Sequence, residues 1–261
     1  MKVRKMCLVL AVLMLASVFA AGCGQSAAEP IVSPAVTEET PVSPEPTAQA
    51  EEKKELPPPP DIDIDSWEYL YAGVVCGVGR YHPNVRNVES QLLDSRVTSA
   101  AQAFLDAARA EGYKVWIGVG YRNFEYTSYW FADAMNDYGG SYEAAQVDYI
   151  FPAGCTEHST GLAIDITDEF DLAANYYNMH DETVKDTEVY KWMAEHCAEY
   201  GFIVRYPEGK EDYYVKACYP GHFRYVGVEA AEYIMENDLC FEEFLNLYPE
   251  KKLHVTFGPE A

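Results

Sequence analysis

Apolar residues recur at helical spacing in several stretches of the chain. The clearest runs from Val97 to Ala108, follows a predicted N-cap at Asp94-Ser95 and stops at Gly112. Further helices are predicted over residues 124–136, 183–200, 228–237 and 241–247. In the first of these the aromatic side chains are expected in the protein core rather than on a sugar-binding surface, and they are Tyr126, Tyr129, Trp130 and Phe131.

Strand patterns lie between the helices. Val115, Ile117 and Val119 alternate with other residues, Leu162–Ile166 is a short apolar run, and Phe202–Tyr206 is followed by a turn and a returning strand over Tyr213–Tyr219. Helices laid on a small, mostly antiparallel sheet make the predicted fold class α+β.

The chain begins with a targeting pattern. A basic start (Lys2, Arg4, Lys5) precedes an apolar run from Cys7 to Phe19 and the small-residue stretch Ala20-Ala21-Gly22-Cys23. This stretch resembles a bacterial lipobox, which implies a signal peptide over residues 1–22 and a lipid on Cys23. An ordinary secretory signal and an uncleaved anchor are the alternatives, but an apolar run of about 15 residues is short for a membrane span of about 20.

Residues 23–65 carry many prolines among Thr, Ser, Ala and Glu, so we expect them to form a disordered tether that precedes a folded domain over residues 66–261. The formal net charge of −23 excludes the basic surface that nucleic-acid binding needs, and it disfavours docking on anionic lipid. We therefore expect no nucleic-acid partner, membrane contact only through the N-terminal lipid, and a monomer.

Five cysteines follow Cys23, an odd number that leaves at least one thiol unpaired: Cys76, Cys155, Cys197, Cys218 and Cys240. None shows the short Cys-x-x-Cys spacing of a zinc site. We expect small buried cysteines or one disulfide of unknown pairing. Metal ligation by Cys155 or Cys218 is the alternative, because both lie close in sequence to the histidines considered next.

The stretch from Cys155 to Ile166 carries the chemistry. As a straight strand it would hold His158 and Asp165 roughly 23 Å apart. Gly161 can adopt positive φ, so the chain can reverse after His158 and bring both side chains to one place, where His222 can join them. Two imidazoles and one carboxylate leave a fourth position open on a divalent ion, as in catalytic zinc sites.

These residues resemble a known family. The pattern His-x-x-Gly-x-Ala-x-Asp, the later run from Gly201 to Lys210 and His222-Phe223-Arg224-Tyr225-Val226-Gly227 are similar to the VanY-type zinc D-alanyl-D-alanine carboxypeptidases, which share a fold with hedgehog domains. The resemblance implies one zinc ion held by His158, Asp165 and His222. Gly120-Tyr121-Arg122 also matches, which implies that Arg122, with Thr156, holds the substrate's terminal carboxylate.

One position departs from the family pattern. Where the family has a general-base Glu three residues before the last histidine, this chain has Tyr219, and Gly221 replaces a Trp. A phenol, with a pKa near 10, is a poor proton acceptor at neutral pH. A phenol can instead donate to an oxyanion, and Glu157, Glu211 or Asp212 could replace the missing base.

The resemblance implies a D-alanyl-D-alanine carboxypeptidase that trims peptidoglycan stem peptides at the outer face of a bacterial cell membrane. Two alternatives stay open. Tyr219 favours a weakened or inactive peptidoglycan-binding lipoprotein, and the same site could act as an L,D-carboxypeptidase or as an endopeptidase on cross-links.

Overall fold

The computed structural model describes residues 55–73, 77–142, 151–167, 182–214 and 219–251, which lie in one compact unit, Lys54–Ala261. The predicted signal sequence, Cys23, most of the predicted tether, Cys76 and Cys218 lie outside these residues. In the part of the chain that is described, no helix is both long and apolar enough to cross a membrane.

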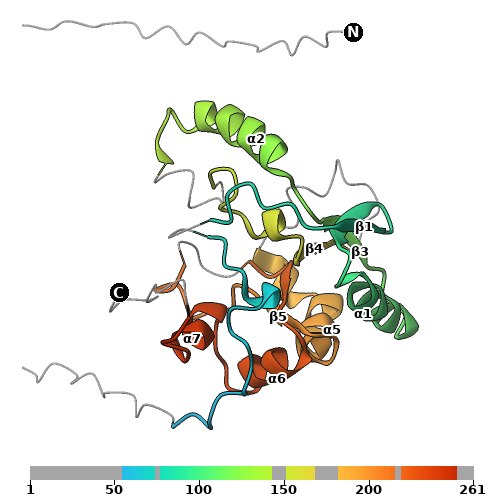
Figure 1. The fold of residues 1–261 in the computed structure, drawn as a ribbon. Helices are drawn as coiled ribbons and strands as arrows, with labels where there is room; N and C mark the ends of the chain where they lie inside the picture. Colours follow the sequence, from blue (N-terminus) through green and yellow to red (C-terminus); the bar gives the residue numbers. More distant parts are fainter. Residues whose placement is uncertain (1–54, 74–76, 143–150, 168–181, 215–218, 252–261) are drawn as a thin grey trace, which may run out of the picture. The chain divides into compact units, whose positions relative to one another are not determined.

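A four-stranded antiparallel sheet carries the site. Its strands are β3 (Trp116–Val119), β4 (Ala163–Thr167), β6 (His222–Tyr225) and β5 (Phe202–Val204), hydrogen-bonded in that order. Every residue of β4 is buried, as expected of a strand with neighbours on both sides. The small antiparallel sheet and the helices around it confirm the predicted α+β class (Figure 1).

Among the described residues β5 pairs with β6, in which Val204 lies opposite Phe223. Most of the returning strand predicted over Tyr213–Tyr219 lies outside them, since residues 215–218 are not described, and a 3.3 Å hydrogen bond from Tyr219 N to Tyr206 O links the two predicted strands. A turn closed by a 3.2 Å hydrogen bond from His222 N to Tyr219 O precedes β6. His222 is therefore the first residue of a buried strand.

A second, two-stranded sheet was not predicted. β1 (Val85–Val88) and β2 (Gln91–Asp94) form a hairpin in which Glu89 adopts a φ of 55°. Asp94 therefore ends a strand and does not cap the following helix, α1 (Thr98–Ala110), whose N-cap is Val97. The Asp94 carboxylate accepts instead from the backbone N–H and the guanidinium of Arg96.

Three helices pack as their apolar spacing predicts. α1 buries Ala101, Phe104, Leu105 and Ala108, and the Phe104 ring lies 5.6 Å from that of Phe223 in β6. α6 (Val228–Glu236) and α7 (Phe241–Asn246) bury their apolar residues in a second cluster, which includes Ile203 of β5. In Figure 1, α1 lies beside β1 and α6 beside β5.

The helix predicted over residues 183–200 is divided into three pieces: η4 (Glu182–Asp186), α5 (Glu188–His196) and η5 (Cys197–Tyr200). The break occurs because Thr187 acts as an N-cap and accepts a hydrogen bond from Tyr190 N. The predicted end is confirmed, since Gly201 takes the left-handed conformation with φ 78°.

The aromatic helix α2 (Phe124–Asp137) is much more exposed than predicted. Thr127 is its one buried residue, whereas Tyr126 is 52% and Tyr129 75% exposed. Asn123 caps its N-terminus by accepting from Tyr126 N. The prediction that these aromatic side chains lie in the core is therefore wrong for Tyr126 and Tyr129.

Residues 56–65 pack against the folded unit, although their composition alone assigns them to the tether. Ile64 is 3% exposed in the α6–α7 cluster. Tyr233 and Tyr248 donate hydrogen bonds to the carbonyls of Pro57 and Pro60, each at 2.7 Å. Proline-rich backbone makes no internal hydrogen bonds, so its carbonyls are free to accept from these phenols.

Candidate metal centre

Two of the predicted ligands are direct neighbours in the sheet. Asp165 of β4 lies opposite His222 of β6 in the strand register, so both side chains lie on the same face. The Nδ1 atom of His222 is 2.7 Å from Asp165 Oδ1. The antiparallel pairing thus brings together residues 57 positions apart in the sequence.

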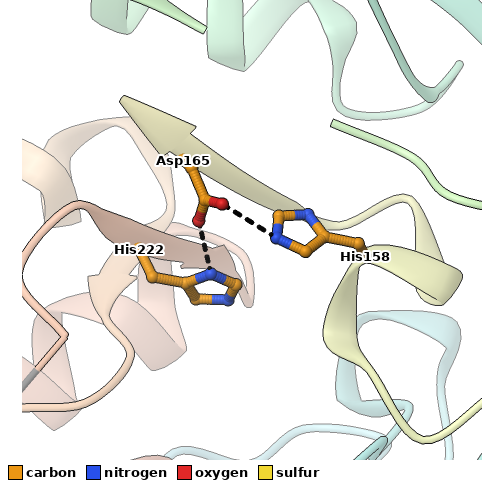
Figure 2. Close-up of side chains that lie close together, drawn as sticks. All are labelled: His158, Asp165 and His222. Carbon is orange, nitrogen blue, oxygen red and sulfur yellow. Dashed lines mark hydrogen bonds and ion pairs between the residues drawn. The ribbon is translucent and has the colours of Figure 1, made fainter. Parts of the chain in front are cut away.

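The third predicted ligand reaches the same carboxylate through a tight reversal. His158 lies in the short 3-10 helix η2 (Glu157–Thr160), which ends at Gly161 with φ 75°. A Cβ at Gly161 would be 3.0 Å from Asp94 N, so the turn needs glycine for space as well as for conformation. His158 Nε2 lies 3.1 Å from Asp165 Oδ2 (Figure 2). The reversal predicted at Gly161 is confirmed.

The three side chains fit a single divalent ion. Their ligand atoms lie within 4.8 Å of one another, and the residues are 2–4% exposed. Both imidazoles point at the carboxylate, from η2 on one side and β6 on the other (Figure 2). Zinc favours such nitrogen and oxygen donors, and three protein ligands leave one coordination position open.

The charges of the site suit metal binding. Burial would raise the pKa of the Asp165 carboxyl, but the two imidazoles outweigh burial and hold its pKa well below the ordinary value. Burial lowers the pKa of His158. For His222 burial acts in the same direction, but Asp165 and Glu157 outweigh it and raise the pKa. The carboxylate is therefore ionised at neutral pH, ready to bind a cation.

Tyr219 lies at the same centre. Its hydroxyl donates to Asp165 Oδ2 at 3.1 Å, and its ring stacks on His222 at 5.4 Å and on Tyr206 at 6.2 Å. The side chain is 5% exposed. Tyr219 is therefore held as a hydrogen-bond donor to a predicted metal ligand.

None of the three carboxylates considered as replacement bases is suited to accept a proton at the centre. Glu157 is buried, and Arg205 and Arg224 outweigh the effect of burial, so its pKa lies below the ordinary value and it is a poor proton acceptor. Glu211 and Asp212 are exposed and do not line the cleft at the centre. Glu211 accepts from Gly209 N instead.

A cleft opens at the centre, with about 400 Å³ of space that includes its opening to solvent. Arg122 and Thr156, the residues expected to bind substrate, line it together with Trp130, Phe151 and the three predicted ligands. A 3.1 Å hydrogen bond from Arg122 N to His158 O fixes the arginine backbone beside the centre. Among the described residues no carboxylate pairs with the Arg122 guanidinium, which leaves it able to bind an anion.

The described cysteines take no part in the centre. Cys155, Cys197 and Cys240 are free thiols, and the metal-binding group found among the described residues contains only His158, Asp165 and His222. Burial raises the pKa of Cys155, which disfavours the thiolate that a metal needs. Ligation by Cys155 therefore has no support, and Cys218 lies outside the described residues.

The sequence interpretation missed a buried set of charges behind the centre. Arg205 and Arg224 are 1% and 0% exposed, and both bind Glu157. Arg205 also binds Glu242 of α7. A signal was present in the sequence, because arginine within a strand of otherwise apolar residues must find an anionic partner.

The fold and the centre together define a small α+β domain with a buried two-histidine, one-carboxylate site at the foot of a cleft. The family model for VanY, D-alanyl-D-alanine carboxypeptidase, matches residues 90–228, more than half of the chain. The protein belongs to this family.

A D-alanyl-D-alanine carboxypeptidase of Enterococcus faecalis is 34% identical over 160 residues, which cover 59% of this chain and 56% of the relative. A D-alanyl-D-alanine carboxypeptidase of Enterococcus faecium is 29% identical over 168 residues, which cover 62% of this chain and 48% of that relative. The chain thus spans about half the length of the curated relatives it matches.

The chain is also similar to solved structures of VanY proteins, one with zinc bound and one with a ligand bound. A vancomycin resistance D,D-pentapeptidase VanY in complex with Zn(II) is 29% identical, with a TM-score of 0.57 over 69% of this chain and 100% of that one. VanYB in complex with D-alanine-D-alanine is 28% identical, with a TM-score of 0.58 over 69% of this chain and 98% of that one. The LD-carboxypeptidase LdcB is 32% identical, with a TM-score of 0.52 over 62% and 74%.

Proposed function

We propose that this protein is a zinc-dependent D-alanyl-D-alanine carboxypeptidase that removes the terminal D-alanine from peptidoglycan stem peptides. The observation that carries the proposal is the convergence of His158, Asp165 and His222 at the foot of a cleft that also holds Arg122. The zinc-bound and D-Ala-D-Ala-bound family structures support the same metal and substrate class.

His158, Asp165 and His222 would hold the ion. When bound, zinc with an open position supplies an activated water and polarises a carbonyl group. The remaining work falls to side chains of the cleft. The Arg122 guanidinium binds the free carboxylate of the substrate with two parallel N–H donors, which places the last peptide bond over the ligand cluster.

We expect this enzyme to have a low catalytic rate, because Tyr219 stands where the family has a general-base glutamate. Its hydroxyl donates to Asp165 Oδ2. Two guanidinium groups bind Glu157 Oε1 and hold the pKa of this carboxyl below its ordinary value, so Glu157 is a poor acceptor for a proton. Among the described residues the cleft has no other carboxylate besides the predicted ligand Asp165. A positioned general base contributes about 10²–10⁴ in rate. The wild-type rate therefore lacks most of this factor.

The test is release of D-alanine from a synthetic pentapeptide ending in D-Ala-D-Ala. The folded unit should release D-alanine slowly in the presence of zinc and not after chelation, and His222→Ala should abolish release. Absence of release from wild-type protein with zinc bound would overturn the proposal.

Tyr219 favours a second candidate function, a peptidoglycan-binding protein without turnover. It would bind the same stem peptide through Arg122 and leave the peptide intact. Calorimetric binding of the pentapeptide without any product would establish this function, and measurable release would exclude it. A tetrapeptide substrate and a cross-linked dimer in the same assay separate D,D-carboxypeptidase from L,D-carboxypeptidase and endopeptidase action.

The cellular place of the protein is part of the proposal. The lipobox-like Ala20-Ala21-Gly22-Cys23 supports a lipid on Cys23 and attachment to the outer face of a bacterial cell membrane. The proline-rich residues that follow would let a monomeric domain reach the cell wall. Metabolic labelling with a radioactive fatty acid tests this, since Cys23→Ala should abolish the label and release the protein into the medium.

A further inference from the structure

A buried ionic network lies behind the metal centre. Arg205 binds Glu157 Oε1 through Nε at 2.8 Å, and its two terminal nitrogens bind Glu242 at 2.9 and 2.5 Å. Arg224 Nη1 binds the same Glu157 Oε1 at 2.9 Å. The four side chains are 0–2% exposed. Two guanidinium groups and two carboxylates balance in charge, which is the condition for burying them at all.

The network ends at a metal ligand. Both guanidinium groups bind Glu157 Oε1, while Glu157 Oε2 has no hydrogen-bond partner within the described residues. The Nε2 atom of His222 is likewise unpartnered and lies 3.6 Å from Glu157 Oε2. The other ring nitrogen, Nδ1, faces Asp165 Oδ1. The His222 imidazole is therefore placed between two carboxylates, one on each nitrogen.

We propose that Glu157 is a positioning residue for the metal site: it accepts the Nε2–H of His222 and so keeps Nδ1 deprotonated and directed at the metal. A neutral imidazole carries one proton, and the acceptor on one nitrogen decides which nitrogen is left to bind a metal. Carboxylates behind metal-bound histidines commonly have this role. The inference rests on the metal site of the proposed function and not on turnover.

Segments beyond the matched region 90–228 complete the network. Glu242 belongs to α7, and Tyr71 donates to Glu242 Oε1 at 3.1 Å. Arg224 Nη2 donates to the carbonyls of Glu68 and Leu70 at 3.0 and 2.6 Å. In a Glu242→Gln variant, Glu157 would be the one carboxylate that still binds Arg205 among the described residues. The N-terminal segment and α7 thus help to hold the carboxylate that orients His222.

The direct test is nitrogen-15 NMR of the histidine rings in zinc-loaded wild-type protein. We expect the His222 ring to carry its proton on Nε2, with slow exchange against water, and to bind zinc through Nδ1. A ring with the proton on Nδ1 and zinc on Nε2 would overturn the proposal. The measurement needs no variant, so it does not depend on the folding of a mutant.

Variants give the size of the effect. Glu157→Gln should weaken zinc binding about 10–100-fold in chelator competition, and Glu242→Gln should weaken it in the same direction. The control is Glu188→Gln, at a residue whose side chain is 78% exposed and paired with Lys191, and it should change nothing. Unchanged affinity in a folded Glu157→Gln protein would contradict the proposal.

The two proposals can fail separately. Zinc binding with the expected His222 tautomer but no release of D-alanine would overturn the proposed activity and support the role of Glu157. Release of D-alanine with the opposite tautomer would do the reverse. Failure to bind zinc at all would overturn both.

Discussion

Replacing Tyr219 with glutamate tests the account of the missing base. The new carboxyl group would point at Asp165 from a shorter side chain than that of Tyr219, whose hydroxyl now donates to Asp165 Oδ2 at 3.1 Å. Two like charges about 6 Å apart repel by about 3 kcal/mol at an effective dielectric constant of about 20. We therefore expect the metal-free variant to be less stable than wild type by a few kcal/mol, or to hold a proton on the new carboxyl group.

A bound divalent ion removes this penalty because it lies beside both carboxylates. Zinc should therefore raise the melting temperature of Tyr219→Glu more than that of the wild type. The new carboxylate also supplies the proton acceptor that the wild type lacks, so kcat/KM for the pentapeptide should rise by about 10²–10⁴.

The assay follows D-alanine release with an oxidase-coupled reaction, together with calorimetric melting with zinc and with chelator. Tyr219→Gln is the matched control, because the glutamine has the size and polarity of glutamate without its charge. Equal rates for the glutamate and glutamine variants, both with zinc bound, would refute the reasoning.

Three further predictions concern the turn, the substrate anchor and the buried network. Urea denaturation should show that Gly161→Ala lowers the free energy of unfolding by more than about 1–2 kcal/mol. Gly209→Ala is the control, because Gly209 also has positive φ (83°) but has open space around its Cβ position. Equal losses in the two variants would contradict the crowding at Gly161. Arg122→Gln should lower kcat/KM about 10–150-fold, which corresponds to a charge-assisted hydrogen bond of about 1.5–3 kcal/mol. With a C-terminally amidated substrate this loss should vanish, and the same loss on both substrates would contradict the role of Arg122. Folding lowers the pKa of Glu157, so the stability that this ionised carboxylate contributes should be full above about pH 4.3, the pKa of a glutamate in the unfolded chain, and should be lost as the pH falls below that value. Urea denaturation between pH 3 and 6 should show this loss of stability in the wild type. An equal loss in Glu157→Gln would contradict the role of Glu157.

The convergence of His158, Asp165 and His222 could be predicted from the sequence because it depends on local features. Gly161 marks the reversal, and the strand after it carries Asp165 at a fixed distance. The helices α1, α6 and α7 were found because each buries one face of a regular apolar pattern.

Other elements depend on contacts that no local pattern records. The β1–β2 hairpin turns through Glu89-Ser90, without the glycine or asparagine that usually marks a two-residue turn. The aromatic residues of α2 show that apolar character alone does not reveal which face of a helix is covered.

The role of Glu157 was hidden for the same reason. It stands next to His158 in the sequence, which made it a plausible base. Its partners Arg205 and Arg224 are 48 and 67 positions away, directly after β5 and within β6. Only the folded arrangement shows that the carboxylate is already bound and that its free oxygen faces His222.

The central claim is that one zinc ion is held by three particular side chains. Anomalous diffraction at the zinc edge, on crystals of the zinc-loaded protein, measures this most directly. We expect a single zinc ion at about 2.0–2.2 Å from His158 Nε2, His222 Nδ1 and an oxygen of Asp165. A crystal that binds zinc elsewhere, or holds none between these three residues, would contradict it.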